Sequence, residues 1–285
     1  MGIYRSILKR FTKSTANLNV LPVDDEILVN TSPISVRSLE IDLIDYGKWV
    51  DEFFPDHVTA FGTKEHKKLL ELYVSWSLLE IEGEHVYMDA AGGKFSYVGK
   101  ITASRKIMQD IDFAQEVIDS AGTEVEFIKC SAAKIDLEDS SVDRISCHHS
   151  IEHFQQNADV DFMNELQRIL KPRGKAVIIP IFISDKHYLI TDLPNFKFWK
   201  EEGEILVDRL AGLPGGPRSG NFSRVYSIDS LQSRLLDAID TKKFKCSIVQ
   251  VKYDGKSVPN ESSFFSPNQA RTNFNYRALE ISRIG

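Results

Sequence analysis

The stretch that decides the fold reads Val142-Asp-Arg-Ile-Ser-Cys147, then His148-His-Ser-Ile-Glu-His-Phe154, and further on Glu165-Leu-Gln-Arg-Ile-Leu-Lys-Pro-Arg-Gly-Lys-Ala-Val-Ile-Ile-Pro180. The first segment predicts a strand. Apolar residues at helical spacing then predict a helix that Asp159 caps and that Pro172 and Gly174 end. The continuous apolar run at residues 176–179 is typical of a strand buried on both faces of a parallel sheet. The stretch therefore predicts a strand, a helix and a second strand of an α/β domain.

The chain upstream supplies the other half of such a domain. Residues 85–89, 106–110 and 125–130 predict three short buried strands, and residues 64–79 predict a helix before the first of them. The turn Asp89-Ala-Ala-Gly-Gly-Lys-Phe95 follows the first strand, and glycines at such a turn let the backbone approach a ligand closely. Residues 227–239 predict a further helix, and residues 244–251 and 278–284 predict closing strands. The chain thus has the pattern of a doubly wound α/β protein.

Two motifs resemble those of S-adenosylmethionine (SAM)-dependent methyltransferases of the Rossmann-like class I, type 11. They are the dipeptide Glu152-His153 after a strand and the segment Arg168-Ile-Leu-Lys-Pro-Arg-Gly174. The segments 109–111 and 149–154 also resemble a bacterial-type subgroup with a degenerate glycine loop. The resemblance implies a Rossmann-like, seven-stranded, mostly parallel sheet with helices on both faces and an antiparallel last strand. It also implies an N-terminal extension and a substrate-loop insertion.

The same resemblance implies a SAM site, beginning with the glycine loop. Asp89, Ala91, Gly92 and Gly93 occupy the positions of this loop, with Gly93 matching a glycine of the family. Ala91 and Phe95 stand where the family has its first and last glycines. We expect the loop backbone to contact the methionine part of SAM.

Further SAM contacts are expected at the ends of the next strands. Asp110 lies where a doubly wound fold places the acid that accepts hydrogen bonds from ribose hydroxyls, and Asp112 is the reserve candidate. Ser131 and Ala132 fall beside the expected adenine, where the Ser131 hydroxyl can bond the amino group. His148 is expected to contact the cofactor as well.

His148 and His149 are the candidate catalytic residues. Both follow the strand at 142–147, near where the methyl group would be presented, and histidine suits proton removal from a hydroxyl acceptor near neutral pH. Strand alternation points one of the pair at the cleft. We expect Glu152 and His153 to orient the loop and to start the next helix.

Composition restricts the class of protein. The 285 residues, 42% hydrophobic and 27% charged, suit one enzyme domain with additions. The net charge of -6 gives no broad basic surface for nucleic acid. Three widely spaced cysteines, Cys130, Cys147 and Cys246, suit reduced buried thiols, not a disulfide framework or a metal site. We therefore expect a cytoplasmic enzyme without a metal.

Three regions of the chain are distinguished. Residues 1–60 are predicted to be an N-terminal extension or lid with strand-like pieces at 26–29 and 39–44, and residues 61–285 a methyltransferase domain. Residues 181–226 are predicted to be an insertion over the cleft, in which Arg218 and Arg224 are candidates for clamping a phosphate or carboxylate.

The start of the chain bears on membrane contact. No apolar run reaches the roughly 20 residues that a membrane-spanning helix needs. Met1-Gly-Ile-Tyr-Arg-Ser6 fits the minimal myristoylation pattern, and the basic, apolar-interleaved start predicts a short amphipathic helix. Peripheral membrane contact through this helix is the alternative to docking on its own domain.

The leading hypothesis is a SAM-dependent methyltransferase that acts on a small or carrier-linked molecule. By resemblance, a sugar hydroxyl in glycan or polysaccharide biosynthesis is the first acceptor to consider. The alternative is a catalytically inactive binding protein of the same fold, in which Phe95 blocks the cofactor. A nicotinamide-dependent oxidoreductase fits less well because the chain lacks Gly-x-Gly-x-x-Gly after its first core strand.

Overall fold

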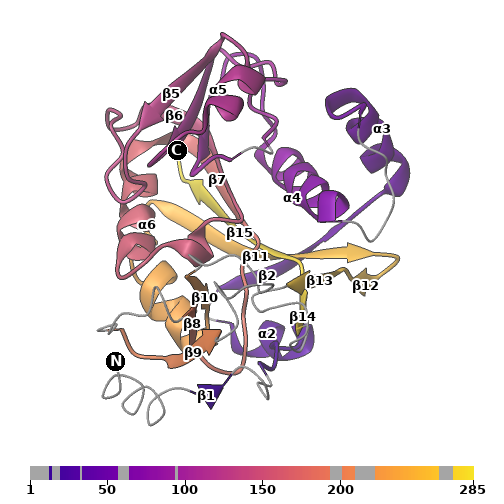
Figure 1. Ribbon diagram of the computed structural model, residues 1–285, viewed down its shortest axis with the longest axis vertical. Coiled ribbons are helices and arrows are strands. Elements are labelled where there is room, and N and C mark those ends of the chain that lie inside the picture. Colours follow the sequence, from indigo (N-terminus) through magenta and orange to yellow (C-terminus); the bar gives the residue numbers. More distant parts are fainter. Residues whose placement is uncertain are drawn as a thin grey trace.

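The main sheet has the predicted Rossmann-like architecture. The structure is a computed structural model that describes residues 13–14, 20–32, 34–56, 64–93, 96–192, 201–208, 222–262 and 272–285. The strands of the sheet run in the order β12-β11-β15-β7-β6-β3-β4-β5, with β2 paired to β11 (Figure 1). Their bounds are β2 (Ser35–Glu40), β3 (Val86–Ala90), β4 (Arg105–Asp110), β5 (Val125–Lys129), β6 (Val142–His148), β7 (Leu170–Ile179), β11 (Phe244–Tyr253), β12 (Lys256–Ser257) and β15 (Arg277–Arg283).

The pairing confirms the predicted direction of each core strand. β3, β4, β5, β6 and β7 pair in parallel, whereas β15 lies antiparallel between β7 and β11. Seven strands form the expected core, and β2 and β12 extend it beside β11. Since parallel strands all end at one edge, the turns after β3, β4 and β6 meet there.

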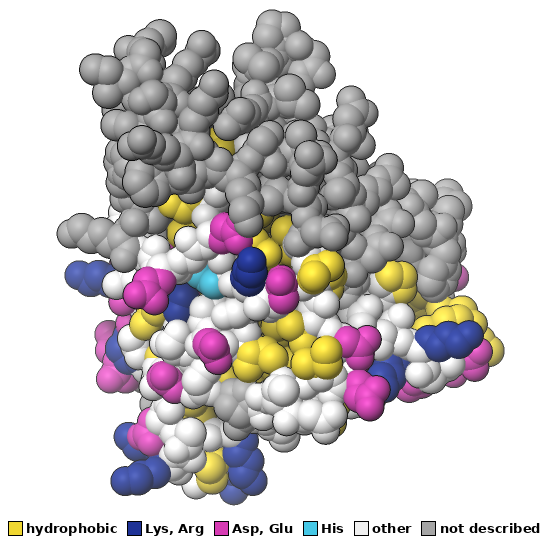
Figure 2. Space-filling view, turned by 90° about the horizontal axis from the view of Figure 1, so that it is seen from below, with side chains coloured by type: hydrophobic (Ala, Val, Ile, Leu, Met, Phe, Trp, Pro, Cys, Tyr) yellow, Lys and Arg dark blue, Asp and Glu magenta, His cyan; other side chains and the backbone are white. Residues whose placement is uncertain are grey.

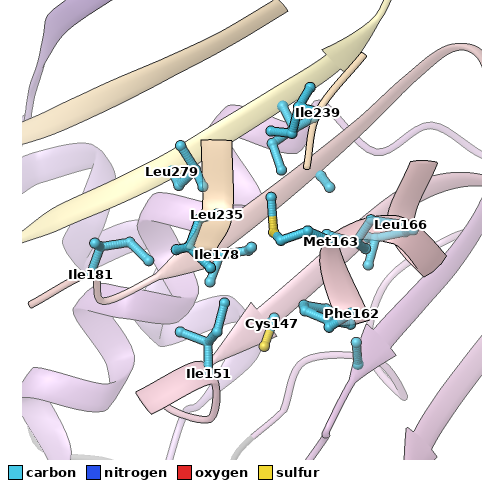
Figure 3. Close-up of a cluster of buried hydrophobic side chains, with 14 of the residues drawn as sticks. Cys147, Ile151, Phe162, Met163, Leu166, Ile178, Ile181, Leu235, Ile239 and Leu279 are labelled. Carbon is cyan, nitrogen blue, oxygen red and sulfur yellow. The ribbon is translucent and has the colours of Figure 1, made fainter. Parts of the chain in front are cut away.

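Helices cover both faces of this sheet. On one face lie α3 (Leu43–Phe53), α4 (Lys64–Leu79) and α5 (Gln115–Ala121), and on the other α6 (Ala158–Ile169), α7 (Ile228–Leu231) and the π-helical turn η3 (Gln232–Leu236). In β7, Ile178 packs toward α6 and Ile179 toward α4, which explains the unbroken apolar run at 176–179. Figure 3 shows the α6 side, where Phe162, Met163 and Leu166 meet the sheet.

Three local expectations were wrong. Residues 26–29 are helical, in α2 (Asp25–Thr31), because Asp24 accepts a hydrogen bond from the Glu26 amide and acidic residues fill the first turn. Residues 39–44 are split between the end of β2 and the start of α3, which Asp42 caps. α6 starts after Asn157, and it ends before Leu170, where β7 begins ahead of Pro172. Asp159 therefore lies inside the helix.

The N-terminal segment is joined closely to the sheet. β2 pairs in parallel with β11, and α3 contacts α4. The buried Arg277 of β15 donates to the Asp25 carboxylate at 2.6 Å and to the Val23 carbonyl oxygen at 2.6 Å. Residues 23–53 thus share the core of the domain. The basic start of the chain lies outside the described residues, apart from β1 (Lys13–Ser14).

The insertion carries a small second sheet. The strands of this sheet run in the order β1-β9-β8-β10. The insertion supplies three of them, which are β8 (Tyr188–Asp192), β9 (Glu204–Asp208) and β10 (Ser223–Val225). The remaining elements are the 3-10 turn η2 (Ile151–His153) and the hairpin of β13 (Pro259–Ser262) and β14 (Thr272–Asn275). Arg218 lies outside the described residues.

Arg224 is not an exposed anion clamp, contrary to expectation. Its fully buried guanidinium donates to Glu201 at 2.7 and 2.8 Å and lies 3.0 Å from the Asp159 carboxylate. It also donates to the carbonyl oxygens of Phe154 and Gln156. Burial by itself raises the pKa of Glu201, but hydrogen bonds from His187 and Arg224 lower it to about 2. Arg224 thus anchors the insertion onto α6 and onto the chain after η2.

The surface agrees with the charge balance of the sequence. On the described part of the face in Figure 2, acidic and basic side chains are interspersed with apolar ones, without a block of one sign. In the described part of the chain, no helix combines the length and the apolar character needed to cross a membrane.

Replacing Arg224 by Met should destabilise the protein by about 3 kcal/mol, because it removes the fully buried cation between Asp159 and Glu201 and leaves only Arg234 and His187 beside them. The free energy of unfolding from urea titration measures this. Arg105→Met is the matched control, since its ion pair with Glu126 is exposed (side chains 42% and 46%) and should be worth less than about 1 kcal/mol. Equal losses in the two variants would contradict the anchoring role.

Candidate active site

A pocket opens at the carboxyl edge of the sheet, between α4, the turn after β3 and the turn after β6. It has about 610 Å³ of empty space, part of it continuous with solvent. Its lining consists of Lys68, Glu71, Leu72, Asp89, Ala91, Gly92, Gly93, His148, His149 and Ser150. Six residues predicted from the sequence therefore meet in one place.

Asp89 is the buried centre of this pocket wall. Its side chain accepts hydrogen bonds from the hydroxyl of Ser96 at 2.5 Å and of Ser146 at 3.1 Å, and it lies 3.3 Å from Nδ1 of His148. It is only 1% exposed. A buried carboxylate is stable when such donors compensate its lost hydration.

His148 is held at both ring nitrogens. Besides the contact of Nδ1 with Asp89, its Nε2 lies 2.6 Å from the Ser75 hydroxyl of α4. Ser75 in turn contacts the Tyr97 hydroxyl at 3.1 Å and donates to the Leu72 carbonyl oxygen. His148 would have to break one of these bonds to take a proton from a substrate. The geometry favours a role in shaping the site, while its catalytic role stays a prediction.

The turn after β3 is braced by a buried amide. The Gln109 side chain accepts a hydrogen bond from the Ala91 amide at 3.2 Å and donates to the Cys130 carbonyl oxygen at 2.6 Å. Ala91 itself has a φ of 51°, in the left-handed region that glycine adopts most easily. Glycine would adopt this conformation at a lower energetic cost than alanine. Gln109 thus links the carboxyl ends of β3, β4 and β5.

The two glycines of the turn have different surroundings. A Cβ on Gly92 would lie 2.8 Å from Met108 Cγ and 3.2 Å from the Asp89 carboxyl carbon. A Cβ on Gly93 would meet nothing within 4 Å among the described residues. Packing therefore requires Gly92, whereas no described residue fills the space beside Gly93. Phe95, the expected obstacle, lies outside the described residues.

Both His148 and His149 line the pocket, whereas strand alternation predicted that only one of them would point into it. The φ of 49° at His149 turns the backbone out of the extended conformation directly after β6, and the His149 amide donates to the Ile179 carbonyl oxygen. Nδ1 lies 3.5 Å from the Glu71 carboxylate and 3.6 Å from that of Glu152. Burial lowers the pKa of His149, but the charges of Glu152 and Glu71 outweigh it and raise this pKa to about 9.

The remaining predicted SAM residues lie outside this lining, at the ends of the neighbouring strands. Asp110 ends β4 half-buried, and burial raises its pKa while the amides of Asp112 and Ile111 work against that rise. Asp112 is instead exposed and paired with Lys129 at 2.6 Å. Ser131 is exposed and accepts a hydrogen bond from the Ala133 amide, whereas Ala132 packs in the core.

Sequence reasoning missed the contribution of α4. Lys68, Glu71 and Leu72 reach the pocket from this helix, and Glu71 is 2% exposed. A signal was present, because Glu71 interrupts the apolar run 69–74 on the buried face of the helix. A lone acid inside such a run is seldom buried without a polar task.

A comparison with protein families gives one match, in the part of the chain that carries the turn after β3 and both histidines. Residues 89–178, about a third of the chain, match a family model described as a methyltransferase domain. This match supports the methyltransferase class predicted from the sequence, and with it SAM as the cofactor. A search of curated proteins found no match.

The solved structures that this chain resembles include several described as methyltransferases. One is 1,6-didemethyltoxoflavin-N1-methyltransferase from Burkholderia thailandensis, with 14% identity, 93% of this chain and 94% of that chain covered, and a TM-score of 0.46. Another is a SAM-dependent methyltransferase from Methanosarcina mazei, with 16% identity, 72% and 94% coverage, and a TM-score of 0.44. Similarity at this level carries no information on the substrate of this chain.

The contrast between the two glycines can be measured. Gly92→Ala should lower the free energy of unfolding by about 1–3 kcal/mol, because the added methyl group overlaps Met108. Gly93→Ala should leave it within about 1 kcal/mol of the wild type or raise it, since the site is open. Thermal or urea unfolding of both variants compares them. A large loss in Gly93→Ala would contradict the difference in packing between the two glycines.

Proposed function

We propose that this chain binds SAM along the carboxyl edge of its sheet and transfers the methyl group to a hydroxyl of a small or carrier-linked acceptor, with a sugar as the first candidate. One observation carries the proposal: the turn after β3 and the two histidines at the carboxyl end of β6 line a single pocket, with Asp110 at the end of the strand next to β3. In open α/β sheets, ligands bind at this edge.

The residues present fit the parts of SAM. The Asp110 carboxylate accepts one hydrogen bond from the Asp112 amide at 3.1 Å and keeps capacity for the ribose hydroxyls. The next side chain, Ile111, is 69% exposed and offers an apolar surface to the adenine, with Ser131 in the loop after β5. The open side of Gly93 would receive the methionine part.

Methyl transfer itself requires little chemistry from the protein. The sulfonium of SAM is a good leaving group, so the enzyme mainly aligns the acceptor oxygen with the methyl carbon and excludes water. A hydroxyl acceptor also needs a residue that takes its proton. His149, with part of its ring exposed in the pocket, is the candidate that the geometry favours over His148.

Two parts of this proposal, the sugar acceptor and the relation to a subgroup with a degenerate glycine loop, come from the resemblance of the sequence. The polar lining of Lys68, Glu71 and His149 is compatible with a hydroxylated acceptor. The free thiols of Cys130, Cys147 and Cys246 suit a cytoplasmic location. The inactive binding protein is less favoured, because residues 89–178 match the methyltransferase family model.

Asp110→Asn should weaken SAM binding about 10- to 100-fold, because the amide is a poorer acceptor for the ribose hydroxyls than the carboxylate. Calorimetric titration with SAM and with S-adenosylhomocysteine measures this. Asp112→Asn is the matched control, two residues away, exposed and paired with Lys129; it should change affinity less than about twofold. If neither ligand binds the wild type at millimolar concentration, the proposed function is wrong.

The acceptor class can be tested with simple compounds. Methyl glycosides of common hexoses and hexosamines, incubated with SAM and the protein, should yield S-adenosylhomocysteine and a methyl ether. Primary amines of similar size are the comparison set. Mass spectrometry of the products identifies the methylated atom. Turnover of amines without turnover of glycosides would overturn the hydroxyl assignment.

A further inference from the structure

Two buried acids meet the inner nitrogen of His149. Glu71 comes from α4 and Glu152 from η2, and their carboxylates lie 3.5 and 3.6 Å from Nδ1. The two acids are 2% and 1% exposed. Two elements far apart in the sequence thus place negative charge on the same atom of one ring. We call these residues the Glu71–His149–Glu152 group.

The two nitrogens of the His149 ring have opposite environments. Nδ1 is buried and has no hydrogen-bond partner among the described residues. Nε2 is neither buried nor hydrogen-bonded in the described part of the chain, and 36% of the side-chain surface is exposed. Since His149 lines the pocket, Nε2 is the nitrogen that a ligand can reach.

The burial of Glu152 indicates that a neighbouring residue balances its charge. Both carboxylate oxygens of Glu152 are buried without a hydrogen-bond donor among the described residues. An isolated buried carboxylate is costly, and a nearby positive charge offsets that cost. The imidazolium of His149 can supply it, since His153 is more exposed and its Nε2 lies farther from Glu152, at 3.8 Å.

We propose that Glu71 and Glu152 are positioning residues whose charges, 3.5 and 3.6 Å from Nδ1, keep a proton on that nitrogen of His149, so that Nε2 takes the proton from the acceptor hydroxyl. This inference rests on the proposed function. A carboxylate behind an imidazole fixes its tautomer and strengthens it as a base. Here two carboxylates share that task, and the left-handed backbone at His149 directs the ring toward them.

The proposed step balances as follows. The acceptor oxygen bonds to the methyl carbon of SAM, and the carbon–sulfur bond breaks with its electron pair left on sulfur. The hydroxyl proton passes to Nε2 of His149. The products are a methyl ether, neutral S-adenosylhomocysteine and an imidazolium, which later releases its proton to solvent.

A pH dependence follows from the surroundings of His149. Glu71 and Lys68 face it from α4, and Glu152 and His153 from η2. Because the pKa of His149 is about 9, the base form is scarce at pH 7 and increases as the pH rises through 9. Turnover should therefore rise with pH up to about that value.

The test measures His149 directly. In the full-length protein, NMR titration of the imidazole carbon-bound protons should give a pKa near 9 in the wild type. This value should fall by roughly one unit or more in Glu71→Gln and in Glu152→Gln, which remove one charge each. Glu71→Asp, which keeps the charge, should recover part of the shift. Glu138→Gln, an exposed acid outside the site, is the matched control and should leave it unchanged.

Turnover on an active methyl glycoside supplies the second readout. In both Gln variants the acid limb of the kcat profile should move to lower pH, and kcat at high pH should fall about tenfold. A purely structural role would lower kcat without moving the limb. His149→Asn, whose side chain tolerates the left-handed backbone, should lower kcat about 100-fold or more with SAM affinity unchanged.

Two results would overturn the inference: an ordinary His149 pKa that both Gln variants leave unchanged, or a wild-type turnover profile that they do not move. Failure of the proposed function is recognised separately, by the absence of SAM binding in calorimetry.

Discussion

The geometry of the site depends on the buried carboxylate of Asp89 and on the groups that donate hydrogen bonds to it. This carboxylate lies at the end of β3 with 1% exposure, and a charge so enclosed requires donors from several directions. Ser96 supplies one from the turn after β3, and Ser146 and His148 supply others from β6. Through His148 and Ser75 the network reaches α4. One buried charge therefore fixes two strands and a helix around the pocket.

The adjacent histidines at the carboxyl end of β6 show how two identical side chains come to have different environments. His148 points into the Asp89 network, where both of its nitrogens are engaged. His149 turns the other way, because its positive φ interrupts the strand geometry, and its inner nitrogen meets two acids. One residue stabilises the wall of the pocket, and the other keeps a nitrogen open to it. Their order in the sequence does not distinguish these roles.

The insertion is connected to the same turn. Arg224 of β10 bonds the carbonyl oxygens of Phe154 and Gln156, and the carbonyl oxygen of Phe222 lies 2.6 Å from Nδ1 of His153. These residues follow or belong to η2, the element that carries Glu152. The position of this acid thus depends on how the insertion is anchored. The buried ion pairs of Arg224 with Asp159 and Glu201 supply that anchor.

The sequence by itself determined the sheet and its edge. Local patterns were sufficient for the core strands and α4, because a strand buried on both faces, such as 176–179, needs an unbroken apolar run. They also placed Asp89, the turn to Gly93 and both histidines at one end of the sheet. They failed at 26–29, where an Asp24 cap outweighed strand-like residues, and at Arg224, whose burial depends on partners 23 and more positions away.

Only the tertiary structure decided how the side chains divide the work. Glu71 and Glu152 meet at His149 because α4 packs over the end of β6, and no spacing in the sequence encodes that approach. The partial burial of Asp110 and the ion pair of Asp112 with Lys129 distinguish these two candidate acids. Fold follows from short-range periodicity, whereas the protonation and reach of a site residue depend on charges brought close by long-range packing.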